Sequence, residues 1–330
     1  VDAPRIYFGQ QSPTYSIVGG PESSNGWEFD YPDDEGGQGG SVQYRFPTQD
    51  VSAGPSVGNL WQKLLYALKF GDEQILFSER VNEHSQILYD RNPRDRVAKV
   101  APFLDLDGRV YPPAVVDGRV KWIIDGYTTS DQYPYAAVRS LEDATTDSLT
   151  ERSASVQALL PKQVNYIRNS VKATVDAYDG SVDLYAWDAE DPILQAWTEV
   201  FPTTLKPMSE ISGDLMSHIR YPPEDLFKVQ RALLGQYHVT NAAEFFSGND
   251  FWQNPPADPT VTNSDVPQPP YYLTLQMPGE DQARFSLMST FIPGGSTARN
   301  VLTGYLAVDA EAGNTPPGEV AEDYGKMRLL

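Results

Sequence analysis

Apolar side chains recur with a period of about 3.6 residues in four segments of the chain, which predicts helices. The clearest segment covers residues 60–70, and Gly71 directly after it suits a left-handed helix end. Three more helices are expected to begin at or just after a proline, because proline fits the first helical turn. They begin at Pro93, behind the capping residue Asn92, at Pro192, which opens 193–200, and at Pro223, which opens 226–237.

Two of these helices carry an apolar stripe that should face the core. In the first helix the stripe consists of Leu60, Leu64, Leu65 and Leu68. In the helix of residues 226–237 it consists of Leu226, Val229, Leu233 and Tyr237. Residues three and four apart share one face of a helix, so both stripes are predicted to pack against other elements.

Alternation of apolar and polar residues predicts strands, and three strand pairs are joined by turn residues. Residues 171–187 form a hairpin around Asp179 and Gly180, a dipeptide that suits a two-residue type I′ turn. Such a turn pairs Tyr178 with Ser181 and therefore Val175 with Leu184. The other hairpins join 113–116 to 119–125 through Asp117 and Gly118, and 271–277 to 284–292 through 278–281.

These elements predict an α+β fold of antiparallel β-hairpins with several packed helices. The segment 139–155 is rich in Ser, Thr and Asp, but similar helix and strand patterns lie on both sides of it. We therefore expect a single composite domain over residues 1–330. The alternative is two domains, 1–138 and 156–330, with 139–155 as a linker.

Composition narrows the class of protein. The chain has 45 Asp and Glu residues against 25 Lys and Arg residues, a net charge of −20, which repels phosphate backbones. Nucleic acid is therefore not an expected partner. No run of 18 apolar residues is present, so the chain is expected to be soluble and to contain no membrane span.

The residues that usually hold metals or act as nucleophiles are scarce. Cysteine is absent, and the three histidines, His84, His218 and His238, are far apart in the sequence. Neither a zinc site nor a serine triad is therefore expected. With 330 residues the chain is long enough for an ordinary core, and we expect it to fold without a cofactor.

Calcium is the one metal for which the sequence offers candidate ligands. The predicted hairpin register places Asp176 opposite Asp183, where two like charges would favour a bound cation. Neutralisation by the neighbouring Lys172 is the simpler alternative. Asp105 and Asp107 resemble the start of a calcium loop, but the downstream glutamate is missing, which favours an ordinary turn.

Two polar clusters are candidates for ligand binding. Arg91 and Arg94 stand at a helix start, where guanidinium groups and backbone N–H groups can hold an anion. The alternative is a local salt-bridge network with the neighbouring acids. The second cluster suits sugar recognition, or else closes a β-structure with polar tips in water, and consists of Asp125, Tyr127, Thr128, Tyr133 and Tyr135.

Several strings along the chain carry a family resemblance. They are RIYFG at 5–9, LLYALKFG at 64–71, RNPRDRV at 91–97, DGYTTS at 125–130, NYIRNSVK at 165–172, PYYL at 270–273 and YGKMR at 324–328. Together they resemble an uncharacterised family of large, multi-spanning membrane proteins from actinobacteria and cyanobacteria. The resemblance extends over nearly the whole chain.

The resemblance implies that membrane spans outside this chain anchor it to the cell membrane and that the chain itself is an extracytoplasmic domain. It implies no activity. We expect a non-catalytic module that binds or supports a cell-envelope component. The alternative is an envelope glycan hydrolase, which would need two carboxylates about 5 to 9.5 Å apart across an open cleft.

Overall fold

The computed structural model describes residues 1–21, 28–33, 40–148, 162–258, 260, 266–295 and 299–330. These ranges contain helices and mainly antiparallel sheets, which confirms the α+β prediction. The chain forms two compact units, each assembled from separate stretches. The first contains Val1–Pro102, Pro112–Ile123 and Thr174–Asp183, and the second contains Phe103–Tyr111, Ile124–Ala173 and Leu184–Leu330.

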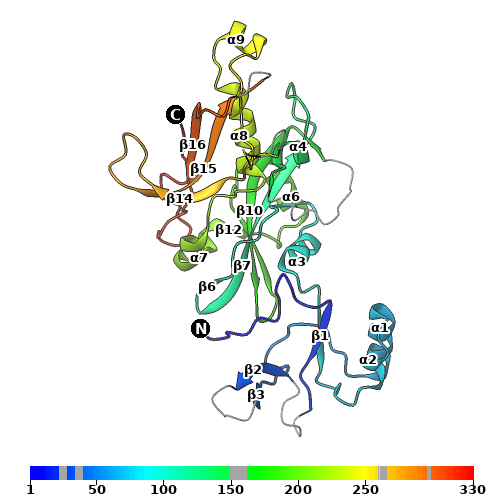
Figure 1. Ribbon diagram of the computed structural model, residues 1–330. Coiled ribbons are helices and arrows are strands. Elements are labelled where there is room, and N and C mark those ends of the chain that lie inside the picture. Colours follow the sequence, from blue (N-terminus) through cyan, green and yellow to red (C-terminus); the bar gives the residue numbers. More distant parts are fainter. Residues whose placement is uncertain (22–27, 34–39, 149–161, 259, 261–265, 296–298) are drawn as a thin grey trace. The chain divides into compact units, whose positions relative to one another are not determined.

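The first unit combines short strands with helices (Figure 1). Strand β1 (Tyr15–Val18) pairs antiparallel with β4 (Gln86–Tyr89), and β2 (Phe29–Asp33) pairs with β3 (Gly40–Gln43). The other elements are α1 (Leu60–Phe70), α2 (Gln74–Phe77), α3 (Pro93–Val100) and β6 (Ala114–Val116), which pairs with the start of β7 (Arg119–Ser130).

Helix α1 has the predicted bounds because both of its ends are determined locally. The side chain of Asn59 accepts a hydrogen bond from the Gln62 N–H, and the Gln62 side chain returns one to the Asn59 backbone. At the other end Gly71 takes a φ of 65°, which glycine adopts without a steric penalty. These contacts involve only neighbours in sequence, so the pattern alone identified the helix.

The predicted core face of α1 is wrong. Leu60, Leu65 and Leu68 are 73%, 48% and 72% exposed. Tyr66 and Phe70 instead pack against the apolar cluster of this unit, with their ring centroids 6.3 Å apart. An aromatic ring buries more area than a leucine, so the side with two rings turns inward.

Two helices begin at the predicted prolines. The side chain of Asn92 accepts hydrogen bonds from two N–H groups in the first turn of α3, where Pro93 is the first residue. Asp191 does the same for α6 (Pro192–Val200) in the second unit. Both caps satisfy backbone donors that have no partner inside the helix.

Two larger sheets contain most of the remaining strands (Figure 1). The first has the strand order β12-β11-β10-β7-β5, with β5 (Asp105–Leu106), β10 (Tyr166–Asp176), β11 (Val182–Ala186) and β12 (Lys206–Pro207). The second is built from β13 (Trp252–Gln253), β14 (Tyr271–Leu275), β15 (Arg284–Pro293), β16 (Gly304–Asp309) and β17 (Met327–Leu329). The pairing of β14 with β15 confirms the hairpin predicted around 278–281.

The second unit also contains two short strands and several helices. They are β8 (Arg139–Ser140), which pairs with β9 (Gln163–Val164), α4 (Leu141–Thr145), the 3₁₀ helix η1 (Met208–Glu210), α7 (Gly213–His218), α8 (Leu226–Tyr237) and α9 (Ala242–Ser247). Residues 139–148, part of the segment considered as a linker, thus belong to this unit. The single-domain arrangement stays a prediction.

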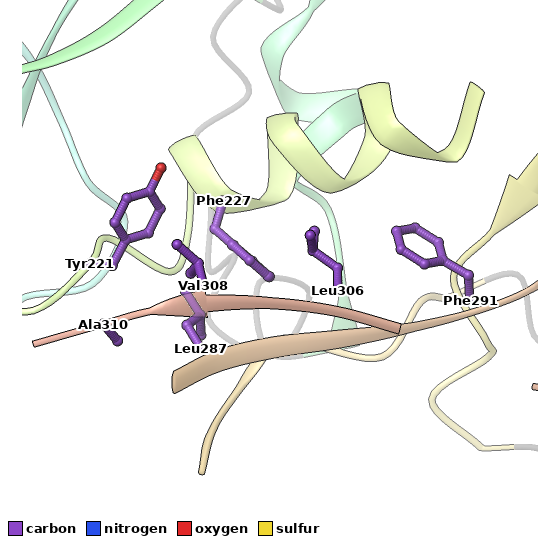
Figure 2. Packing of buried hydrophobic residues seen from close by; sticks show 7 residues of the cluster. All are labelled: Tyr221, Phe227, Leu287, Phe291, Leu306, Val308 and Ala310. Atoms are coloured by element: carbon purple, nitrogen blue, oxygen red, sulfur yellow. The ribbon is translucent and has the colours of Figure 1, made fainter. Parts of the chain in front are cut away.

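Helix α8 packs on the second sheet through Phe227. Figure 2 shows Phe227 pointing from α8 toward the strands, where Leu287, Leu306 and Val308 lie. All four side chains are fully buried. The bounds of α8 are those predicted. Which of its other side chains are buried depends on how the helix lies on the sheet.

The predicted packing stripe of α8 is wrong in its second half, although Leu226 packs against the buried cluster as predicted. Leu233 and Tyr237 are 38% and 58% exposed, whereas Lys228 and Arg231 are 0% and 2% exposed. A buried cation needs partners that come from other parts of the chain. The apolar pattern of the helix cannot show those partners, so it did not reveal that Lys228 and Arg231 are buried.

The hairpin at Asp117 and Gly118 is confirmed. Val116 pairs with Arg119 across a two-residue turn. The φ angles of Asp117 and Gly118 are 50° and 78°, and two positive values are what a type I′ turn requires.

The hairpin between β10 and β11 is present, but its predicted register is wrong by two residues. The Asp176 N–H donates to the Ser181 carbonyl at 2.9 Å, so Asp176 stands opposite Ser181. Gly180 has a φ of 74°, while Asp179 has no positive φ, so the turn is not type I′. The Asp176 carboxylate accepts the N–H groups of Tyr178 and Asp179, which widens the turn.

Candidate functional site

Arg91 and Arg94 lie at the start of α3 in the first unit. Arg91 is buried, and its Nε donates to the Tyr7 carbonyl at 2.6 Å. Burial lowers the pKa of the Arg91 guanidinium. Arg96, one turn further along, donates to the Gly180 carbonyl. The side-chain contacts of Arg91 and Arg96 are therefore with backbone oxygens, and anion binding by Arg91 and Arg94 stays a prediction.

Strand β7 buries three of the predicted binding residues inside the protein. Asp125, Tyr127 and Thr128 are 1%, 0% and 0% exposed. The Tyr127 hydroxyl donates to Asp107 at 2.5 Å, and the Thr128 hydroxyl donates to Asp191 at 2.5 Å. These polar groups therefore face internal partners and line none of the pockets described below.

Asp125 is the centre of a buried polar network that the sequence analysis missed. Lys172 Nζ donates to Asp125 Oδ1, and both side chains are 1% exposed. The Tyr111 hydroxyl donates to Asp125 Oδ2 at 2.5 Å, and Asn169 Nδ2 donates to Oδ1 at 3.1 Å. Burial lowers the pKa of Lys172, while the charge of Asp125 opposes that shift.

A second carboxylate belongs to the same network. Burial, together with the negative charge of Asp125, raises the pKa of Asp107 to about 6. The Tyr127 hydroxyl and the N–H of Arg109 hydrogen-bond to this carboxylate and limit the shift. A carboxyl group with such a pKa suits acid/base chemistry, but Asp107 is 0% exposed and its role here is to hold the network together.

One signal in the sequence could have revealed this network. Lys172 stands between Val171 and Ala173 in β10, a strand whose last seven residues are all buried. A lysine inside such a strand requires an internal carboxylate. That carboxylate is Asp125 of the neighbouring strand β7. The pairing of β7 with β10 cannot be read from the sequence around either residue.

Tyr133 and Tyr135 remain at the surface. The Tyr133 ring stacks on Tyr166 with 5.7 Å between centroids. Its backbone N–H donates to Asn165 Oδ1, and Asn165 Nδ2 donates back to the Tyr133 carbonyl, both at 2.9 Å. Tyr135 is fully exposed and has a φ of 61°, a value that non-glycine residues rarely adopt. Paired hydrogen bonds therefore hold the tyrosine segment in place.

This segment forms one wall of a pocket in the second unit, which we call the tyrosine groove. Its volume is about 460 Å³. The groove is lined by Tyr135, Ala136, Ala137, Arg139, Ser140, Leu141, Ala144, Val164, Asn165, Tyr166, Ile167, Val229, Ala232, Leu233 and Tyr237. The side chains that α8 leaves exposed, Leu233 and Tyr237, thus form part of this lining.

The lining of the tyrosine groove combines tyrosine rings, alkyl side chains and one cation. Arg139 lines the groove and donates to Gln236 at 3.1 Å. The Tyr166 hydroxyl donates to Asp191 at 2.6 Å, which leaves the ring in the groove wall. Such a surface binds an apolar chain or the apolar face of a sugar ring.

Three of the carboxylates considered as calcium ligands contact other side chains of the protein. The Asp176 carboxylate forms a salt bridge with Arg119 Nε at 2.9 Å. Arg119, and not Lys172, therefore neutralises the charge of Asp176. Asp105 accepts from Lys162, and Asp107 belongs to the buried network. Among the residues that the structure describes, no group of three metal-ligating side chains is found. Calcium binding by Asp176 and Asp183 stays a prediction.

Comparison with known proteins identifies relatives along the whole chain. Proteins named "UPF0182 protein" are 58% identical in Bifidobacterium adolescentis, 60% in an Arthrobacter species and 54% in Micrococcus luteus. Each alignment covers 99% of this chain but only 30%, 32% and 30% of the respective relative. The chain therefore spans about a third of the length of these relatives.

Three further findings concern solved structures, membrane-spanning helices and the protein family. No solved structure matches the chain significantly. None of the helices in the described ranges has the length and apolar character that a bilayer span requires. The model of the uncharacterised protein family UPF0182 matches residues 1–330, which confirms the resemblance to an uncharacterised family. The chain belongs to the uncharacterised protein family UPF0182.

Proposed function

We propose that this chain is the extracytoplasmic domain of a multi-spanning membrane protein and serves as a non-catalytic module that binds a cell-envelope component. The larger part of each relative's length lies outside the matched region, which leaves room for membrane spans there. The net charge of −20 supports a partner other than nucleic acid. The partner in this proposal is a wall fragment or a lipid-linked sugar.

The observation that carries the proposal is the composition of the tyrosine groove. Its alkyl floor, from residues such as Leu141, Val164 and Val229, suits a lipid chain. The exposed rings of Tyr135 and Tyr237 suit a sugar face. At about 460 Å³ the groove has the volume of a small-molecule site.

The hydrolase alternative requires two carboxylates that face an open cleft. None of the residues that line the tyrosine groove in the described structure is acidic. The two carboxylates of the buried network, Asp107 and Asp125, are 0% and 1% exposed. Hydrolysis would therefore need another site, and binding is the function that this groove supports.

A binding screen tests the role of the groove. The isolated chain is titrated with wall fragments and with lipid-linked sugars, and affinity is compared between wild type and Tyr237→Ala. Tyr237 is an exposed helical residue, so alanine removes the ring without disturbing the core. We expect weaker binding by about tenfold, the usual effect of losing an aromatic contact at a binding site.

Tyr271→Ala is the matched control, because Tyr271 is 48% exposed on β14 and does not line the groove. Equal binding by wild type and both variants would refute the groove as the site. If no compound of either class binds, the binding module itself is refuted.

Protease accessibility tests the location. The full-length protein is exposed to protease in intact, wall-stripped cells. Release of a fragment that contains this chain is expected, because the proposal places it outside the cytoplasmic membrane. Cleavage that occurs only after lysis would place the chain inside.

A further inference from the structure

A second pocket of the second unit is lined by a buried cation that forms no direct ion pair with a carboxylate among the described residues. Arg231 of α8 is 2% exposed, and its Nη1 donates to the Gln268 carbonyl at 2.9 Å and to Ser289 Oγ at 3.4 Å. Both acceptors are neutral. Among the described residues, no carboxylate forms an ion pair with Arg231.

The neighbouring acids are already engaged by other cations. Lys228, one turn before Arg231, forms ion pairs with Asp147 at 2.5 Å and with Glu224. Arg109 also reaches Glu224, at 3.3 Å. Burial lowers the pKa of Arg231 to about 10, although the charges of Asp147 and Glu224 oppose the shift. The guanidinium therefore remains charged at neutral pH, and burying a charge without a directly paired counter-ion is unfavourable.

Arg231 lines a pocket of about 540 Å³, which we call the arginine cavity. A second guanidinium, Arg299, and the amides of Gln253, Asn254 and Asn300 also line it. None of the lining residues in the described structure is acidic, although the chain carries a net charge of −20. Among the described residues, two cations and three amides line this cavity without a carboxylate, which makes it a positive site in an acidic protein.

The rest of the cavity wall is apolar and held in place. Trp252 stacks against His238 with 3.6 Å between ring centroids, and its ring lies 5.6 Å from Phe291. A Cβ atom on Gly304 would lie 2.3 Å from the Trp252 ring, so only glycine admits the ring at this position. Trp252 and Phe291 therefore present a rigid apolar surface beside the two guanidinium groups.

The polar side is pre-organised as well. Asn254 Nδ2 donates to Ser289 Oγ at 3.1 Å, and Ser289 Oγ also accepts from Arg231. Arg231 and Asn254 are thus held through one hydroxyl of β15. Asn254 Nδ2 also donates to the Thr290 carbonyl at 3.3 Å, so its N–H groups are engaged and an anion would bind the guanidinium groups. A ligand would meet an Arg231 side chain that is already positioned, which lowers the entropic cost of binding.

We propose that the arginine cavity binds a small organic anion, with its carboxylate or phosphate on Arg231 and Arg299 and its apolar part against Trp252 and Phe291. A guanidinium binds either anion through paired N–H donors. The anionic group of the ligand would pair directly with the Arg231 guanidinium. This site is separate from the tyrosine groove and does not depend on the function proposed there.

Calorimetric titration of the whole chain tests the proposal. The probes are phenyl phosphate and benzoate, which share a ring and differ in the anion, and benzyl alcohol as the neutral control. We expect saturable binding of at least one anion and none of benzyl alcohol, and the tighter anion identifies the natural headgroup. Lack of binding by both anions, or equal binding of the neutral alcohol, would overturn the proposal.

Variants then locate the site. Arg231→Met and Arg299→Met should each weaken anion binding by about tenfold or more, because each removes charge-assisted hydrogen bonds. Arg139→Met, in the tyrosine groove, is the matched control and should bind as wild type does. Arg299 is exposed, so its variant remains informative even if Arg231→Met fails to fold. Unchanged affinity in Arg299→Met and in a folded Arg231→Met would place the anion elsewhere.

Discussion

Lys172 and Asp125 form an ion pair in the interior of the second unit, where each side chain is 1% exposed. The two residues are 47 positions apart in the sequence, and they come from the neighbouring strands β10 and β7. Tyr111 and Asn169 satisfy the remaining acceptor positions of the carboxylate. The pair thus joins two strands through charge in a place where most proteins use apolar contacts.

Removing one member of this pair should destabilise the protein strongly. Lys172→Met leaves Asp125 as a buried anion without a cation, and we expect a loss of about 3 to 5 kcal/mol in the free energy of unfolding. Chemical denaturation measures the loss. The double variant Lys172→Met with Asp125→Leu should recover most of it, because no lone charge remains. Equal losses in the single and double variants would contradict a buried ion pair.

Asp107 should make stability depend on pH. The folded state raises its pKa from 3.8 to about 6, so the folded protein holds this proton more tightly than the unfolded chain does. The stabilisation from this group is complete below pH 4 and is lost as the pH rises to 6. The loss amounts to about 3 kcal/mol from the size of the shift.

Comparison with Asp107→Asn isolates this effect, because other carboxylates titrate in the same range. The difference in unfolding free energy between wild type and Asp107→Asn should change between pH 4 and pH 6 and level off above. Asp131→Asn removes a carboxylate at an exposed position and is the matched control for the substitution itself. A flat difference for Asp107→Asn would mean that this carboxyl group is ionised throughout the range.

Two glycines of the first unit should respond differently to alanine. Gly71 and Gly180 have φ values of 65° and 74°, so both substitutions strain the backbone. At Gly71 a Cβ atom would have no neighbour within 4 Å, whereas at Gly180 it would lie 2.6 Å from the Phe8 ring. We expect Gly71→Ala to lower stability by about 1 to 2 kcal/mol from the backbone alone.

Gly180→Ala should lose about 1 to 3 kcal/mol more, because the Phe8 ring must move. Thermal or chemical unfolding of both variants gives the difference. If the two losses are equal, Phe8 does not lie against the turn. The double variant Gly180→Ala with Phe8→Leu would then show no recovery.

The two faces of α1 should differ in their effect on stability. Phe70→Ala removes a ring that packs against the apolar cluster, and we expect a loss of about 2 kcal/mol or more. Leu68→Ser changes a side chain that is 72% exposed and should alter stability by less than about 0.5 kcal/mol. Denaturation of the isolated chain tests both. A larger loss for Leu68→Ser than for Phe70→Ala would restore the leucine face as the packed face.

Some features of this protein follow from residues that are close together in the sequence. Helix α1 ends at Gly71, α3 begins behind Asn92, and the type I′ turn forms at Asp117. In each case the groups that decide the conformation lie within a few residues of one another. Pattern and capping chemistry therefore sufficed for these elements and for the α+β class.

The β10–β11 turn depends on a residue that is distant in the sequence. Its local pattern favours a two-residue turn, but Arg119 bridges Asp176 at 2.9 Å and Asp179 at 2.7 Å. Arg119 lies 57 and 60 positions away from these acids. A contact at that separation changes which hydrogen bonds the turn can make, and it leaves no mark in the sequence around the turn.

The sequence by itself therefore determined the class, the bounds of helices such as α1 and α8, and the family, because those depend on local geometry and on long matching strings. Only the tertiary structure decided which charges are buried and what they contact. Asp125 forms an ion pair with Lys172, whereas Arg231 donates to two neutral acceptors beside a cavity. The free energy of a charge depends on everything within a few ångströms of it, and folding brings those groups together from distant parts of the chain.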